Sequence, residues 1–186
     1  MNDHFREEVV TKRNRTMESL VYVLANIVMV LAGAYALFMV NLLISVISIN
    51  GFSAQMALEI ALVVIMGGVA VLLFLYRDRI KTEYEYTFTN GTMDFAQVFN
   101  NKKRKALGTM NVRNVEACGM VASGAFNRYL TMPGMKRLNW FLNRDADLFF
   151  FYFTKEAQKT LLVIEPSEEM VNLIKKYVGA GKYQIN

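Results

Sequence analysis

Residues 20–49 read LVYVLANIVMVLAGAYALFMVNLLISVISI, a run without a single charged side chain. A helix needs about 20 apolar residues to cross the roughly 30 Å of hydrocarbon in a bilayer. As a helix this run would extend about 45 Å, so it must tilt or project from the bilayer at one end. It is also about twice as long as the apolar core of a cleaved signal peptide. The run therefore predicts a membrane-spanning helix.

A second uncharged run, residues 60–76, follows after a short polar connection. Together with the residues from Ala54 onward, it has the length of an ordinary membrane span. Residues 50–53 join the two runs, so we expect two antiparallel helices that lie side by side. Beyond Arg77 charges recur every few residues, as in a soluble domain of about 100 residues.

Basic residues flank the predicted hairpin at one side only. Four precede the first span and three follow the second, whereas the connection between the spans has none. Because Lys and Arg accumulate in cytoplasmic segments, both ends of the chain are predicted to be cytoplasmic. The predicted division is a cytoplasmic N-terminal segment (residues 1–19), a two-helix transmembrane hairpin (20–76), a soluble cytoplasmic domain (77–178) and a tail (179–186).

The two ends of the chain carry weak structural signals. Phe5 and Val9 lie one helical turn apart, and Glu8 precedes Lys12 by four residues, which favours a helix. The apolar face of such a helix is too thin to anchor it. We therefore expect a short, frayed helix within residues 2–19 and a loose C-terminal tail.

Polar and small residues inside the spans are candidate helix contacts. Asn26 and Asn41 are expected to hydrogen-bond across the hairpin or into a partner helix, for about 0.5–2 kcal/mol each. Glu59 should lie near the outer interface, because a proton or ion path needs more intramembrane charges than this one. Three glycines would let helix backbones approach closely, within the hairpin or against another protein. The candidate intramembrane contacts are thus Asn26, Asn41, Gly33, Gly67 and Gly68.

The soluble domain begins with a β-hairpin pattern. In residues 82–89, TEYEYTFT, aromatic and polar side chains alternate, which predicts a half-buried strand. Asn90-Gly91 is a strong signal for a tight hairpin turn, and residues 92–99 form the returning strand. A second polar turn, NNKKR, leads into two more strands, residues 105–112 and 113–118.

The remaining sequence predicts a loop, three strands and a helix. Residues 119–137 contain several Gly and Pro, so we expect a long loop with a helical turn near residues 126–130. Three strands follow, and the run at residues 148–153 is apolar on both faces, as in a central strand. Ser167 is a good helix cap before an acidic first turn, and apolar residues at helical spacing follow it.

Three stretches of the chain, EYTFTNG, NKKRK and IEPSEEMVNLIKKY, follow two predicted spans. This arrangement resembles the YcxB-like bacterial membrane proteins, whose soluble part is pleckstrin-homology-like (PH-like). The resemblance implies an α+β domain: a partly open antiparallel barrel of about seven strands, closed by the C-terminal helix. It also implies a bacterial cytoplasmic membrane location, and it supplies no activity.

The net charge of +5 lies mainly after the second span, where 17 Lys and Arg face 11 Asp and Glu. In eukaryotic PH domains, basic residues around an early hairpin bind phosphorylated lipid headgroups. The alternative is that a charged turn simply keeps the protein soluble. Lipid contact would contribute about 1 kcal/mol per basic residue near the surface. The candidate anionic-lipid contacts are Lys102, Lys103, Arg104, Lys105, Arg77, Arg79 and Lys81.

Catalytic and metal-binding patterns are weak in this sequence. Residues 143–147 alternate acidic and amide side chains as in a calcium loop, but the required glycine and distal glutamate are missing, so we expect a hairpin tip. Cys118, the only cysteine, is expected to be a buried apolar residue that fits a reducing compartment. His4 is the only histidine, and no activated nucleophile, P-loop or metal-ligand cluster is apparent. Trp140 and residues 149–153 are expected in the core, and a nucleic-acid partner is disfavoured.

The sequence therefore predicts a membrane protein without enzymatic activity, cofactor or metal. Our first hypothesis is an adaptor that associates with itself or with another membrane protein and presents a cytoplasmic PH-like domain. The alternative is a module that senses anionic lipid through the basic turn. A transport subunit is disfavoured, because two spans with one isolated glutamate cannot line a pathway unless many copies assemble.

Overall fold

The computed structural model describes residues 4–185, which divide into two compact units. The helical hairpin comprises residues 14–81, and the sheet domain comprises residues 4–13 together with residues 82–185. The hairpin is thus inserted into the sheet domain between its first two strands. The sequence prediction instead began the soluble domain at residue 77 and left the N-terminal segment outside it.

The helical hairpin consists of two long apolar helices, α1 (Arg15–Asn50) and α2 (Met56–Tyr76), followed by the short 3-10 helix η1 (Arg77–Ile80). Both long helices are apolar and long enough to cross a membrane. Few of their side chains are buried: Ala32, Leu43, Met56 and Val63 lie where the helices pack together. Apolar side chains exposed around both helices suit a lipid environment.

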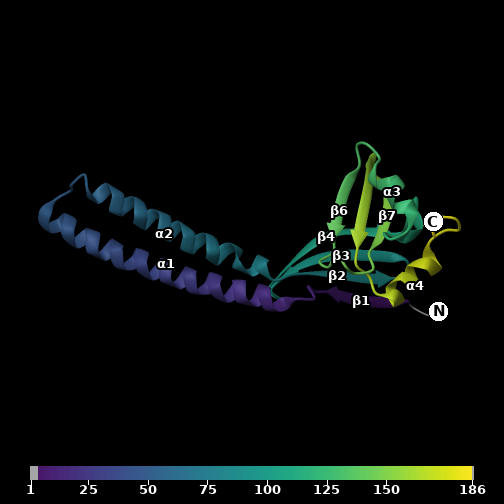
Figure 1. The fold of residues 1–186 in the computed structure, drawn as a ribbon, viewed down its shortest axis with the longest axis horizontal. Helices are drawn as coiled ribbons and strands as arrows, with labels where there is room; N and C mark the ends of the chain where they lie inside the picture. The colour runs from purple at the N-terminus through teal and green to yellow at the C-terminus, as the bar shows by residue number, and fades with distance from the viewer. Residues whose placement is uncertain (1–3, 186) are drawn as a thin grey trace. The chain divides into compact units, whose positions relative to one another are not determined.

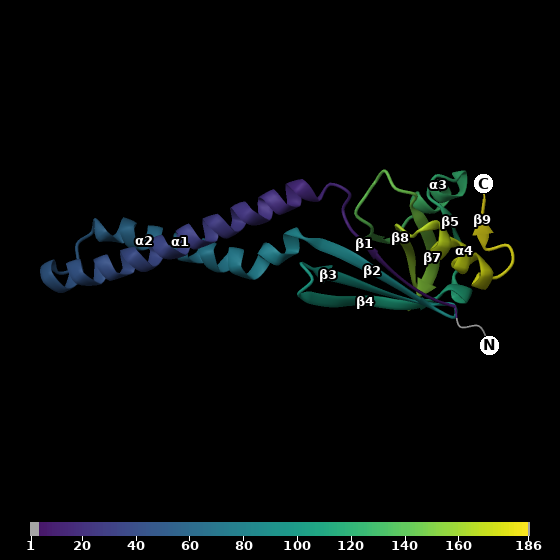
Figure 2. The same ribbon diagram turned by 90° about the horizontal axis from the view of Figure 1, so that it is seen from below.

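The N-terminal segment forms a strand, so the predicted frayed helix was wrong for this part of it. Strand β1 (Phe5–Val10) pairs antiparallel with β2 (Thr82–Thr89) along its whole length. Figure 2 shows these two strands running side by side. Phe5 and Val9, whose spacing favoured a helix, both lie exposed on the outer face, whereas Val10 is buried. Pairing with a distant strand thus overrides the local helical spacing.

The first sheet has the order β1-β2-β3-β4 and is antiparallel throughout. Strand β3 (Thr92–Phe99) follows the predicted turn, in which Asn90 and Gly91 have φ angles of 50° and 95°. Strand β4 (Lys103–Asn111) carries a bulge opposite Phe95 and Ala96. One face of this sheet points into the core, where Tyr86, Phe88, Met93 and Phe95 are almost fully buried.

The second sheet has the order β6-β8-β7-β5-β9 and mixes parallel with antiparallel pairs. Its strands are β5 (Ala117–Met120), β6 (Lys136–Trp140), β7 (Phe149–Lys155), β8 (Gln158–Ile164) and β9 (Tyr183–Gln184). A 3-10 turn, η2 (Val112–Asn114), precedes it. These strands run across those of the first sheet, as in orthogonal sheet packing (Figure 1).

Two sequence predictions about this sheet were wrong. Strand β6 pairs parallel with β8, so the loop at residues 141–148 passes from one strand to a non-neighbour and is not a hairpin tip. The tail is not wholly loose, because β9 pairs parallel with β5. With β1 and β9 added, residues 4–185 contain nine strands rather than about seven.

Two helices cover the sheets. Helix α3 (Gly124–Leu130) packs on the outer face of the second sheet, where Phe150 and Tyr152 contact Tyr129. Helix α4 (Glu168–Tyr177) places Met170 and Ile174 in the main core between the sheets. Strand β7 is therefore buried on both faces, as its apolar run predicted.

Candidate functional site

The two connections to the helical hairpin leave from one end of the first sheet. The last residue of β1, Val10, lies opposite Tyr84, and Thr82 begins β2 directly after Lys81. Thr82 lies opposite Phe99 on β3, which in turn lies opposite the first residue of β4. Because neighbouring strands are about 4.8 Å apart, the first residues of β2 and β4 lie about 10 Å from each other. The turn between β3 and β4 thus lies at this same end.

Four exposed basic residues lie in that turn and at the start of β4: Lys102, Lys103, Arg104 and Lys105. We call these four residues the basic turn. Asn100 and Asn101 adopt φ angles of 49° and 53°, which suits a tight hairpin turn. Strand alternation puts Lys103 and Lys105 on one face and Arg104 on the other, where its Nε donates to Oε2 of Glu85 at 2.6 Å. The four basic residues are therefore not one continuous patch.

The other three candidate lipid contacts lie at the end of the helical hairpin, in or next to η1. The guanidinium of Arg79 lies 4.7 Å from the ring centre of Tyr76, and Nζ of Lys81 lies 4.7 Å from that of Tyr22. Arg77 donates to Oδ1 of Asn26 across the hairpin. Aromatic and basic side chains gathered at one end of apolar helices are typical of the headgroup level of a membrane.

The candidate intramembrane residues are of two kinds: asparagines that hydrogen-bond within α1, and glycines, some of which lie where α1 and α2 pack together. Asn26 and Asn41 each donate to a carbonyl oxygen one turn earlier in α1, at 2.6 Å and 2.9 Å. A Cβ on Gly33 would lie 3.8 Å from Cβ of Ala70, so this glycine lies at the contact between α1 and α2.

Gly67 and Gly68 differ although they are neighbours. A Cβ on Gly67 would lie 3.9 Å from Cβ of Ala36, whereas a Cβ on Gly68 would meet nothing within 4 Å among the described residues. Gly67 therefore faces α1 and Gly68 faces away from it. Glu59 lies exposed in the first turn of α2.

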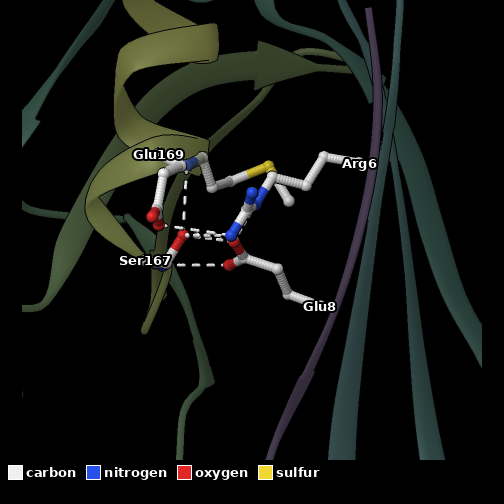
Figure 3. Close-up of polar contacts among 5 residues, drawn as sticks. Arg6, Glu8, Ser167 and Glu169 are labelled. Carbon is white, nitrogen blue, oxygen red and sulfur yellow. Dashed lines mark hydrogen bonds and ion pairs between the residues drawn. The ribbon is translucent and has the colours of Figure 1, made fainter.

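A polar clamp joins β1 to the start of α4 (Figure 3). Glu8 accepts hydrogen bonds from the backbone N–H of Ser167, at 2.9 Å, and from its hydroxyl. Arg6 contacts Glu8 through Nε at 2.5 Å and Glu169 through Nη2 at 3.2 Å. A carboxylate at a helix N-terminus interacts favourably with the unpaired N–H groups there. Sequence reasoning missed this clamp because it did not predict β1.

The clamp also changes the ionisation of its charged groups. The pKa of Glu169 is lowered by its backbone hydrogen bond, by Ser167 and by the charge of Arg6. The hydrogen bond to Glu8 raises the pKa of Arg6. Both shifts favour the charged forms of Arg6 and Glu169.

Asn143 makes a second polar connection, from the loop before β7 to the residues that follow β1 and to the residue that follows β8. Its side chain is buried. The side-chain amide donates to the carbonyl oxygen of Thr11 at 3.0 Å and to Oε1 of Glu165 at 2.7 Å. Oδ1 of Asn143 accepts a hydrogen bond from the backbone N–H of Arg13 at 2.9 Å. Arg13 also pairs with Asp145 at 2.6 Å. In the segment that resembles a calcium loop, Asn143 and Asp145 thus bind other residues of the domain. No group of three or more potential metal ligands occurs among residues 4–185.

Several hollows in the sheet domain could receive a ligand, and one of about 650 Å³ lies over the first sheet. Two others have walls from both sheets or from α4. The larger of these, about 730 Å³, lies between β1, the loop before β7 and the start of α4. Several of its charged lining groups already have partners: Arg6 and Glu8 in the clamp, and Glu165 at Asn143. The smaller, about 290 Å³, is a groove between β4 and β6 with a largely apolar floor.

The remaining residues singled out from the sequence belong to the core. Cys118 is fully buried, and this burial raises the pKa of its thiol to about 12, so it is protonated and unreactive at neutral pH. Phe149, Phe150 and Phe151 are also fully buried. Trp140 is partly buried, packs 5.0 Å from Phe95 between ring centres and lines the smaller groove.

A comparison with protein families matches residues 2–182 to a bacterial PH-like domain, DUF6106. The match spans both the helical hairpin and the sheet domain, and it confirms the bacterial PH-like character that the sequence resemblance implied. Comparisons with curated proteins and with solved structures gave no match.

Proposed function

Because this chain belongs to the bacterial PH-like domain family, we propose that it is a non-enzymatic adaptor of the bacterial cytoplasmic membrane. In this proposal α1 and α2 cross the bilayer and both chain ends are cytoplasmic. The sheet domain then presents a docking surface for another protein. The partner is a second membrane protein or another copy of this chain.

The observation that supports this proposal most strongly is the insertion of the helical hairpin into the PH-like domain. Its two ends connect to β1 and β2, which are neighbouring antiparallel strands. A domain attached through a single linker can sample many positions. Two short connections at one end of one sheet restrict the distance that the domain can move from the hairpin. Such a domain is held close to the membrane, as a platform for a partner requires.

The chemistry of the described residues also favours binding over catalysis. The single cysteine is buried with a raised pKa, and in the larger hollow Glu8 is bound by Arg6 and Ser167 while Glu165 is bound by Asn143. Catalytic sites usually combine a nucleophile or acid–base group with an open pocket. The smaller groove combines an apolar floor with polar and charged side chains around it, as protein-binding surfaces combine an apolar centre with a polar rim.

A second candidate function is contact with anionic lipid through the basic turn. Its support is the position of Lys103, two strands away from Thr82, the residue at which the chain arrives from α2 and η1. The basic turn therefore lies at the end of the first sheet that receives the chain from η1. Such contact would be screened by salt over about 8–10 Å.

Native mass spectrometry of the full-length protein, extracted from its own membrane in mild detergent, tests both functions. A complex with a second protein or copy, at fixed stoichiometry and stable in high salt, is the expected result for an adaptor. A monomer that retains anionic lipid, and loses it when residues 102–105 are changed to Ala, would favour lipid sensing instead. A monomer without lipid or protein would contradict both functions.

A further inference from the structure

The groove between β4 and β6 has two strand edges as its walls. Within residues 4–185, β4 pairs only with β3, and β6 pairs only with β8. Each strand therefore has one edge without a strand neighbour. Free edges expose backbone N–H and C=O groups that can pair with an added strand.

The two edges differ in how well they could accept such a strand. On β4, a bulge next to Gly108 interrupts the regular ladder, and Lys and Arg occupy the first positions. Bulges and edge charges of this kind protect a strand against pairing. Strand β6 has no bulge in its register with β8. The edge of β6 is therefore the better template, with β4 as the opposite wall.

The floor of the groove is apolar and continues into the main core. It is formed by the partly buried Leu107, Leu138, Trp140 and Phe153 and by the buried Leu162. A volume of about 290 Å³ is at the lower limit for pockets that enclose small-molecule ligands. It is large enough for one or two apolar side chains projecting from a strand.

The charged residues at the rim of the groove carry a small net positive charge. Lys136 and Lys155 line it, with one acidic residue, Glu156. Lys103 and Lys105 lie further along β4, on the strand face that continues from the floor. This charge complements an acidic segment and would repel a basic one.

We infer that this groove binds an extended, acidic segment of a partner protein, which adds to the edge of β6 and inserts apolar side chains between β4 and β6. Backbone hydrogen bonds to the strand edge supply affinity, and the apolar floor and basic rim supply selectivity. This inference rests on the proposed adaptor function and identifies the surface through which it acts.

The experiment uses the full-length protein in lipid nanodiscs and a phage library displaying random peptides of about a dozen residues. Enriched peptides are synthesised, and their binding is measured by fluorescence anisotropy. We expect acidic peptides with apolar residues at every second position. The double variant Lys136→Glu/Lys155→Glu should bind them at least about tenfold more weakly, because two attractive charges become repulsive.

A matched control carries the same change in charge elsewhere on the domain. Lys159→Glu/Lys176→Glu alters two other exposed lysines, which do not line the groove, and should change affinity less than about twofold. Methylating the backbone nitrogens at alternate peptide positions removes the N–H groups that would pair with β6. One of the two alternate sets should abolish binding, and the other should be tolerated.

Three results would overturn the inference. One is a library that yields no binding peptide, and another is equal weakening by the groove variant and the control. The third is peptide binding that is insensitive to both sets of backbone methylation.

Native mass spectrometry of the groove variant separates this inference from the adaptor function. A partner complex that persists in Lys136→Glu/Lys155→Glu would leave the adaptor standing and reject the groove. A homodimer lost in the same variant would show that a second copy, not an acidic partner, occupies it. Absence of any complex in the unaltered protein would reject the adaptor function itself.

Discussion

Replacing Glu8 by Ala tests the clamp that fastens the N-terminal strand to α4. Glu8 accepts bonds from the backbone N–H and the hydroxyl of Ser167 and from Nε of Arg6, and its side chain is 12% exposed. Hydrogen bonds to a charged group contribute about 1.5–3 kcal/mol, and bonds that share one carboxylate do not add. We therefore expect the sheet domain to lose about 2–3 kcal/mol of its free energy of unfolding.

The only tryptophan, Trp140, reports the unfolding of this domain. Its ring lies against Phe95 in the core, so its fluorescence should change when the two sheets separate. Urea unfolding of the full-length protein in detergent should show a midpoint lower by about 1–2 M for Glu8→Ala, given an m-value of about 1–3 kcal/mol/M. The m-value itself should be unchanged.

Glu7 provides the matched control. It has the same charge on the same strand, but it is exposed on the opposite face. Glu7→Ala should shift the midpoint by less than the equivalent of about 0.5 kcal/mol. Equal midpoints for the two variants would refute the reasoning, because they would show that β1 is not fastened to α4 through Glu8.

Three further predictions follow from other contacts. Gly67→Leu should destabilise the helical hairpin by about 1–3 kcal/mol because Gly67 faces Ala36, whereas Gly68→Leu should have little effect because Gly68 faces open space; circular dichroism melting in detergent compares them, and equal melting temperatures would contradict the packing. The pKa of Glu169 is lowered on folding, so the ionised group stabilises the domain above its ordinary pKa of 4.5 and this contribution is lost as the pH falls through the lowered value. Glu169→Gln should therefore flatten the acid limb of the unfolding midpoint against pH, and an unchanged acid limb would argue against the clamp. At neutral pH, Cys118 should react with a maleimide at least about 100-fold more slowly than a cysteine introduced at Lys159, because it is buried and its thiol is protonated; similar rates would contradict its placement in the core.

The parts of the fold set by local sequence were predicted well. Long uncharged runs identify the two helices of the hairpin without any tertiary information. The turn at Asn90 and Gly91 and the helix capped by Ser167 also depend on neighbouring residues only, and both occur where they were predicted. Signals of this kind lie within a few residues of the element that they determine.

The parts that depend on distant partners were missed. Strand β1 pairs with residues more than 70 positions later, and nothing in its own six residues specifies that pairing. The parallel pairing of β6 with β8, and of β5 with β9, likewise depends on strand order rather than local pattern. The resemblance to PH-like proteins implied an antiparallel barrel, so the sequence prediction contained neither parallel pair.

In the candidate site, too, local features were predictable from the sequence and features that depend on distant residues were not. Exposure of the basic turn was predictable because a charged hairpin turn is solvated almost anywhere. The pairing of Arg104 with Glu85 was not, because it requires the register of three strands. The groove was also missed, since its walls are edges of two different sheets whose strands are about 30 residues apart in sequence.

The most direct test of the account is the membrane topology of the chain. In a Cys118→Ala background, a single cysteine is placed either at Phe52, between α1 and α2, or at Lys159, on β8. Both positions are exposed. Intact cells with a permeabilised outer envelope are treated with a maleimide that cannot cross the cytoplasmic membrane.

We expect Phe52→Cys to be labelled in intact cells and Lys159→Cys to be labelled only after the cytoplasmic membrane is opened. That result would place the PH-like domain in the cytoplasm, with the helical hairpin crossing the bilayer between β1 and β2. Labelling of Lys159→Cys in intact cells would contradict the account. So would protection of Phe52→Cys until the membrane is opened, because the hairpin would then not cross the bilayer.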